Sequence, residues 1–265
     1  MIVKAGCIFA GIDGTGETDD ATYAVSFANS FVKKLSTQWR SDLRFYNRGP
    51  AFWGTATKQL GNDAAAFVAE RWKTVLAHSG TPFVFLAGYS RGGAAVIHAS
   101  RELKKKGINV TCMLLYDPVD STPTLALDVR TVPSNVVRCY RAYRAPETRS
   151  REDFNNCGLS ADSPGVTKFV TFAPFRCTHS GMGGMPWLRN DSQTKLSNNF
   201  ICEPGPSTRK ASAQASAASR PLIAQLSYAE ALATTATTVT PEDDARISQS
   251  AGAQMASCLL SSLPN

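Results

Sequence analysis

The chain contains 265 residues, of which 43% are hydrophobic and 18% are charged, a composition that is ordinary for a soluble globular protein. A chain of this length forms one large domain, or one domain with an appendage, and can bury a sizeable core. Its net charge of +7 favours an anionic partner, either a membrane surface or nucleic acid, although many enzymes are equally basic. No uncharged apolar stretch is long enough to cross a bilayer, which excludes a protein built on membrane-spanning helices.

The N-terminus and the cysteines bear on the compartment. Lys4 precedes only the short apolar run AGCIFAGI before Asp13 and has no clear cleavage site after it, so we expect no secretory signal. The seven cysteines include no Cys-x-x-Cys pair, which argues against a zinc ribbon and favours free thiols. Cys157, Cys177 and Cys202 could pair after export. We expect a cytoplasmic protein, or one exported by a leaderless route.

Six apolar runs have the length of β-strands, and helical patterns lie between several of them. The runs are VKAGCIFAG, DLRFYN, PFVFLAG, INVTCMLLY, NVVRCYRAY and TKFVTFAP. Apolar residues at helical spacing predict helices over 21–39 and 62–78, and a third helix over 91–106 ends in lysines before Gly107. This alternation predicts an α/β fold: a mainly parallel sheet with helices on both faces and a site at the carboxyl ends of its strands.

The composition changes after about residue 205, where the chain becomes rich in Ala, Ser and Thr. We therefore expect a catalytic domain over residues 1–205 and, over 206–265, a low-complexity linker with a helical appendage. One helix is expected around 221–235. The last helix begins at Thr240, with Pro241 and then acidic residues in its first turn, as the helix dipole favours.

The stretch GIDGTGET, residues 11–18, follows the first expected strand and has the glycine spacing of a phosphate-binding P-loop. Glu17 stands where that motif requires lysine, and a carboxylate there would repel the terminal phosphates. Asp19 likewise occupies the third glycine position of the dinucleotide-binding motif Gly-x-Gly-x-x-Gly. Neither kind of nucleotide site is therefore expected.

The segment FVFLAGYSRGGAAVIHASREL contains Gly-x-Ser-x-Gly at residues 88–92, directly after an apolar strand and directly before a helix. That setting is typical of a nucleophile elbow, in which a tight turn lifts the serine hydroxyl above the sheet at a helix N-terminus. We interpret Ser90 as a catalytic nucleophile.

A serine nucleophile needs a histidine base, and the base needs an acid that fixes its tautomer. His179 follows the last expected strand and is the predicted base, whereas His78 and His98 precede the acid in the chain. The acid should end a strand between Ser90 and His179. Asp117 follows such a strand directly and is preferred, and Asp120, three residues later, stays open as the alternative.

Hydrolases of this kind need a second oxyanion donor besides the amide of Arg91, and it comes from the loop after an early strand. The loop GIDGTG leaves such a strand. We expect the amide of Gly14 or Thr15 to complete the oxyanion hole, and Asp13 to orient the loop.

These motifs together resemble the α/β-hydrolases typified by type VI secretion phospholipase effectors, the Tle group. The similar segments are FAGIDGTGE, FYNRGPAFWGT, GYSRGG, YDPVDS and HSGMGG, in that order across residues 8–184. The chain departs from the group at Gly181, where the histidine motif has an aspartate. The resemblance implies an α/β-hydrolase fold and hydrolysis of lipid esters, and it assigns the acid to Asp117.

Two weaker patterns bear on a lipid substrate. Large apolar residues lie on loops that are expected to border the site. We expect them either to contact an acyl chain or membrane or simply to pack the loops. They are Phe52, Trp53, Met182, Met185 and Trp187. A cluster of arginines is expected either to meet lipid headgroups or to form a solvated face. Its members are Arg138, Arg141, Arg144, Arg149 and Arg151.

The sequence thus predicts a serine esterase of the α/β-hydrolase type that uses no metal or cofactor and acts on carboxylic esters, with lipid acyl esters favoured. An anionic membrane surface is an expected partner, and nucleic acid is not, because no groove-reading helix or stacking motif is present. The alternatives are an esterase or thioesterase for a small soluble substrate, and a catalytically silent binding module of the same fold.

Overall fold

A computed structural model describes residues 6–51, 56–120, 127–151, 154–186 and 237–264. Its centre is a six-stranded sheet in the order β2-β1-β3-β4-β6-β8, and every neighbouring pair is parallel. The strands are β1 Cys7–Ile12, β2 Arg44–Asn47, β3 Phe83–Tyr89, β4 Val110–Tyr116, β6 Val136–Ala142 and β8 Lys168–Thr171. Each of the six apolar runs supplies one of them. A separate parallel pair consists of β5 Thr131–Val132 and β7 Ser160–Ala161.

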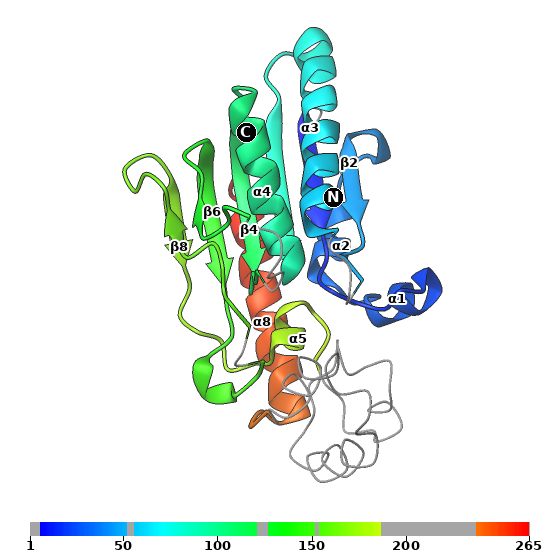
Figure 1. Cartoon of the computed structure of the whole chain (residues 1–265), viewed down its shortest axis with the longest axis vertical. Helices are drawn as coiled ribbons and strands as arrows, with labels where there is room; N and C mark the ends of the chain where they lie inside the picture. Colours follow the sequence, from blue (N-terminus) through cyan, green and yellow to red (C-terminus); the bar gives the residue numbers. More distant parts are fainter. Residues whose placement is uncertain (1–5, 52–55, 121–126, 152–153, 187–236, 265) are drawn as a thin grey trace.

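Helices cover both faces of this sheet (Figure 1). They are α1 Asp20–Ser26, α2 Phe31–Ser36, α3 Thr57–Ser79, α4 Arg91–Lys105, α5 His179–Met182 and α8 Pro241–Leu260, with 3-10 turns η1 Ser41–Leu43 and η2 Pro146–Thr148. α3 and α4 pack on one face, and α2 and α8 contribute to the apolar core on the other. The predicted fold class, a mainly parallel α/β sheet with helices on both faces, is confirmed.

The helix predicted over residues 21–39 is two short helices, α1 and α2, and the single-helix prediction is wrong. The break lies at Ser30, whose hydroxyl oxygen accepts the amide of Lys33 at 3.1 Å and so caps α2. The same hydroxyl donates to the carboxylate of Asp13 on the first loop. A contact with a residue far away in the sequence therefore ends the helix, while Phe27 and Leu35 of the predicted stripe are still buried.

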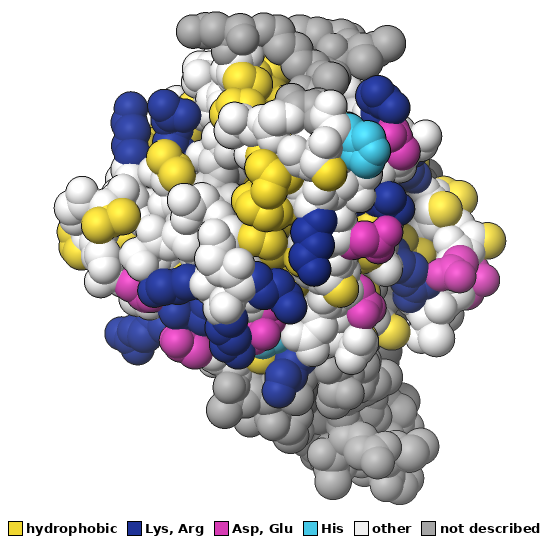
Figure 2. Space-filling view, turned by 90° about the horizontal axis from the view of Figure 1, so that it is seen from above, with side chains coloured by type: hydrophobic (Ala, Val, Ile, Leu, Met, Phe, Trp, Pro, Cys, Tyr) yellow, Lys and Arg dark blue, Asp and Glu magenta, His cyan; other side chains and the backbone are white. Residues whose placement is uncertain are grey.

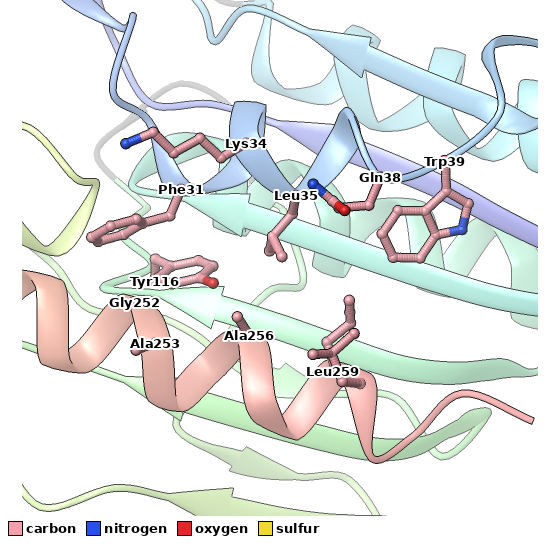
Figure 3. Close-up of a pocket in the computed structure, with 11 residues that line it drawn as sticks. Phe31, Lys34, Leu35, Gln38, Trp39, Tyr116, Gly252, Ala253, Ala256 and Leu259 are labelled. Atoms are coloured by element: carbon pink, nitrogen blue, oxygen red, sulfur yellow. The ribbon is translucent and has the colours of Figure 1, made fainter. Parts of the chain in front are cut away.

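The predicted start of the last helix is confirmed, because Thr240 caps α8 and Pro241 occupies its first turn. α8 lies along the sheet, in contact with β4 and β6, and its Ala256 points toward Leu35 of α2 (Figure 3). A pocket of about 320 Å³ remains between the two helices, with Tyr116 of β4 in its lining. The division at residues 205 and 206 and the helix expected around 221–235 lie outside the described residues.

Cys157 and Cys177 are buried free thiols, and Cys202 lies outside the described residues. Within the described part of the chain, every helix is too short or too polar to span a bilayer.

Candidate active site

Ser90 occupies the turn between β3 and α4, and its backbone has φ 54° and ψ −129°. A positive φ is strained for a residue with a side chain, so the surroundings must hold this turn in place. The amide of Ser90 donates to the carbonyl of Tyr116 at 3.1 Å, and its carbonyl accepts from the amides of Gly93 and Val119. Gly92 must be glycine here, since a Cβ would lie 2.2 Å from the carbonyl oxygen of Ile12. This strand–turn–helix geometry is typical of a nucleophile elbow.

The structure brings together the three side chains that the sequence analysis grouped. His179 Nε2 lies 2.9 Å from Ser90 Oγ, and His179 Nδ1 lies 2.7 Å from Asp117 Oδ2. All three residues are at least nine-tenths buried. A proton on Nδ1 donated to the carboxylate leaves Nε2 as the acceptor for the serine hydroxyl, which is the tautomer a general base requires.

The carboxylate of Asp117, the preferred candidate acid, contacts the imidazole of His179. Asp117 follows β4 directly and has a positive φ of 42°, with its amide donating to the carbonyl of Ala142 at 2.7 Å. Asp120 lies further along the same loop, where its amide donates to the carbonyl of Asn155.

The backbone and ring of His179 are held from several sides. Its amide donates to the hydroxyl of Ser150 at 2.7 Å, and its carbonyl accepts from the hydroxyl of Tyr89 at 3.0 Å. The ring of Phe154 meets the imidazole edge-on, with centroids 4.9 Å apart. Sequence reasoning missed these three neighbours. Of the three, only Tyr89 could have been placed near the site from the sequence, because it belongs to the Gly-x-Ser-x-Gly motif.

A buried guanidinium supports the acid. Arg144 Nη1 pairs with the same Asp117 oxygen that His179 contacts, while Arg144 Nε donates to the carbonyl of Ser150 at 2.6 Å and Nη2 to that of Arg151 at 2.8 Å. Burial by itself raises the pKa of Asp117, but Arg144 and the hydrogen bond from His179 outweigh it and hold the pKa well below its usual range. The acid therefore stays ionised.

The predicted arginine surface is wrong for three of its five members. Arg141, Arg144 and Arg151 are buried, with exposed fractions of 5%, 7% and 2%. Arg138 is half-buried and Arg149 is exposed. Arg144 pairs with Asp117, and the guanidinium of Arg141 lies over the ring of Tyr143. The spacing of the arginines in the sequence does not indicate these contacts.

The loop after β1 lies against the turn that holds Ser90. Gly14 approaches Ser90 so closely that a Cβ there would lie 2.9 Å from the serine Cβ. Thr15 Oγ1 accepts from Arg91 Nε at 2.6 Å, and Arg91 Nη2 donates to the carbonyl of Ala51 at 2.8 Å. Gly14, Thr15 and Arg91 thus surround one side of Ser90, and Arg91 is the first residue of α4.

Asp13, at the base of this loop, is completely buried. Its carboxylate accepts from the hydroxyl of Ser30 at 2.7 and 2.8 Å and from the hydroxyl of Tyr46 at 2.6 Å. Burial raises the pKa of Asp13 to about 7, and the hydrogen bonds from Tyr46 and Ser30 offset only part of this shift. Sequence reasoning gave Asp13 a role in orienting the loop but missed both of its partners.

Of the two alternatives left open for the methionines, the structure agrees with packing, because Met182 and Met185 are buried in the apolar core. Phe52, Trp53 and Trp187, which were expected beside them, lie outside the described residues. Among the described residues, His, Cys, Asp and Glu side chains nowhere gather in a group of three that could hold a metal ion.

The other two histidines lie away from Ser90. His98 Nε2 is 2.9 Å from the side-chain oxygen of Asn62, and His78 Nδ1 is 2.8 Å from the carbonyl of Thr74. Both contacts are with residues of α3.

Comparison with known proteins finds matches among solved structures alone. No family model matches the chain, and no curated protein does. An uncharacterized protein from Pseudomonas aeruginosa is similar at 13% identity with a TM-score of 0.45, over 95% of this chain and 51% of that one, so the chain spans about half of its length. A cutinase-like protein from Cryptococcus sp. is similar at 18% identity with a TM-score of 0.28, over 64% of this chain and 77% of that one. Likeness at this level says nothing about the reaction.

The buried carboxyl of Asp13 predicts a pH-dependent stability. Its pKa of about 7 in the folded state exceeds the usual 3.8, so between these values the folded chain holds a proton that the unfolded chain has released. The contribution of Asp13 is therefore greatest below about pH 4 and is lost as the pH rises through 7. Asp13→Asn removes this titration, and its free energy of unfolding should vary less than that of the wild type over this range. Urea titrations at several pH values measure the free energy of unfolding of the wild type and of the variant. The same dependence on pH in both proteins would contradict the prediction.

Proposed function

We propose that the protein is a serine hydrolase that cleaves carboxylic esters through an acyl-enzyme, with lipid acyl esters as the favoured substrates. The observation that carries this proposal is the unbroken hydrogen-bonded series from Ser90 through His179 to Asp117, at 2.9 and 2.7 Å. Ser90 itself lies on a strained turn between β3 and α4, the position at which a nucleophile elbow holds its serine.

In the proposed reaction, Ser90 Oγ attacks the ester carbonyl carbon and transfers its proton to His179 Nε2. Asp117 holds the imidazole by Nδ1 and stabilises the positive charge that forms on it. The carbon–oxygen bond to the leaving alcohol then breaks as His179 returns the proton to that oxygen. Water repeats the sequence on the acyl-serine, releasing the carboxylic acid and restoring the serine hydroxyl.

The developing negative charge on the carbonyl oxygen needs preorganised donors. We assign this role to the amide of Arg91 at the N-terminus of α4, where the helix dipole also favours an anion. The amide of Gly14 or Thr15 is the second donor. Support comes from the close approach of Gly14 to Ser90 and from the bond between Arg91 and Thr15, which fastens the loop to the elbow.

The lipid preference rests on the resemblance of the motifs to the Tle group and on the positive net charge of +7. Two exposed arginines, Arg149 and Arg176, flank the segments that hold His179, at the carboxyl edge of the sheet. The opposite face, at the amino ends of the strands, carries Lys and Arg mixed with Asp and Glu (Figure 2). We assign the contact with an anionic surface to the edge that bears Arg149, Arg176 and the site.

Loss of the nucleophile or of the base should abolish hydrolysis. A fluorophosphonate probe should label Ser90 in the wild type, and Ser90→Ala should take no label and lose activity on a short-chain ester by roughly 10³-fold or more, because triad members act as a unit. His179→Ala should lose nearly as much. His78→Ala and His98→Ala are the matched controls and should keep most of the activity. Undiminished hydrolysis by Ser90→Ala would refute the mechanism.

The two carboxylates should differ in their effect on the rate. Asp117→Asn alters the tautomer and the charge stabilisation of His179 and should lower kcat by roughly 10³–10⁴-fold. Asp120→Asn should lower it by less than about tenfold, because the carboxylate of Asp117 is the one that lies 2.7 Å from Nδ1 of the imidazole. Steady-state kinetics on one ester rank the two variants. A reversed ranking would transfer the role of the acid to Asp120.

A lipid substrate predicts that activity rises on anionic vesicles and falls with salt, since exposed charges are screened over about 10 Å at 0.1 M. The double variant Arg149→Glu/Arg176→Glu should then lose activity on anionic vesicles and keep it on a short soluble ester. Its matched control, Lys104→Glu/Lys106→Glu, makes the same charge change at the far end of α4 and should behave as the wild type.

Kinetics on phosphatidylglycerol vesicles and on a short-chain ester, each at two salt concentrations, measure these effects. Equal activity of all three proteins on vesicles, with no response to salt, would leave a small soluble ester or thioester as the substrate.

A further inference from the structure

The helix that carries His179 has an incomplete N-cap within its own sequence. α5 begins at His179, and Thr178 caps it by accepting the amide of Gly181 on its side-chain oxygen at 2.9 Å. In a capping box, the side chain three residues after the cap reaches back and accepts the cap residue's own amide. That position is Gly181, which has no side chain to do so.

Asp244, from the first turn of α8, supplies the missing acceptor. Its Oδ1 accepts the amide of Thr178 at 2.6 Å, and its Oδ2 accepts the hydroxyl of the same threonine at 2.8 Å. The carboxylate is completely buried. It also fills the space that a side chain at Gly181 would take, because a Cβ there would lie 2.6 Å from Asp244 Oδ1.

Burying a carboxylate is costly unless hydrogen bonds and charge compensate it. Two donors from Thr178 and the position in the first turn of α8, where the helix dipole favours an anion, give this compensation. The result is a link from the C-terminal helix to the residue directly before His179. Ser150 binds the amide of His179 and Tyr89 binds its carbonyl, while the hydrogen bonds between Asp244 and Thr178 attach the same turn to α8.

We propose that Asp244 is a positioning residue for His179: it completes the capping box of α5 from α8 and so fixes the imidazole between Ser90 and Asp117. This inference rests on the proposed function for its kinetic effect, but not for its effect on the imidazole. Geometry has a large influence on rate here, because a misplacement of ~1 Å in a catalytic group can cost about 10²-fold.

The first test removes the charge at nearly constant shape. Asp244→Asn should lower kcat on a short-chain ester by about tenfold or more with KM changed less than about twofold, since the chemistry and not binding is affected. In the proton NMR spectrum, the downfield signal of His179 Nδ1–H, assigned by its loss in His179→Ala, should weaken or broaden. Asp243→Asn is the matched control, because Asp243 is exposed and pairs with Arg246. It should leave both measurements unchanged.

The second test moves the carboxylate to the position where a capping box would have it. Gly181→Asp should be harmful by itself, since its Cβ meets the carboxylate of Asp244. Asp244→Ala should be harmful because the amide of Thr178 loses its acceptor. The double variant Gly181→Asp/Asp244→Ala should regain the His179 signal and at least about a tenfold higher kcat than Asp244→Ala.

The outcomes separate this inference from the proposed function. If the wild type neither hydrolyses esters nor reacts with the fluorophosphonate probe, the function fails, and the His179 signal still tests Asp244. If Asp244→Asn folds and retains both kcat and the signal, the inference is overturned. If Asp244→Ala does not fold, the double variant must restore folding together with the signal, and a double variant no better than Asp244→Ala also overturns it.

Discussion

The buried ion pair between Arg144 and Asp117 is the interaction on which the geometry of the site depends. Arg144 also binds the carbonyls of Ser150 and Arg151, and the hydroxyl of Ser150 in turn accepts the amide of His179. One guanidinium therefore ties the acid to the segment that holds the base. Removing one partner of such a buried pair costs about 3–5 kcal/mol, which is a large part of the stability of a domain. The pair therefore fixes a negative charge beside His179 that cannot easily be lost.

Similar logic applies on the other side of Ser90. Asp13 is buried behind the loop and is bound by Ser30 and Tyr46, which come from the start of α2 and the end of β2. The loop that approaches the serine is thus anchored by a polar group that cannot easily move, because leaving any of these hydroxyl or carboxyl groups unpaired would cost about 1–3 kcal/mol. The site is assembled by buried polar contacts between elements, and the apolar core supplies the frame.

The strands, the elbow and the series from Ser90 to His179 could be predicted from the sequence, since each depends on local signals: apolar runs of strand length, a glycine-flanked serine and the order of residues along the chain. Features that depend on contacts between distant residues could not. The break at Ser30 needs Asp13, and the burial of Arg144 needs Asp117. From the sequence, Asp244 could be interpreted only as one of several acidic residues at the start of a helix. No neighbouring residue indicates its hydrogen bond with Thr178.

The place of Asp244 in the chain has a consequence for synthesis. Domains form largely as the chain emerges, and the elements from β1 to β8 precede α8 by many residues. A nascent chain can therefore lay down the whole sheet and bring Ser90 to its turn while the acceptor for Thr178 has not yet been made. The attachment of the histidine turn to Asp244 can form only when α8 docks. On the role proposed for Asp244, the base that Ser90 needs would be positioned only after this last helix has been synthesised.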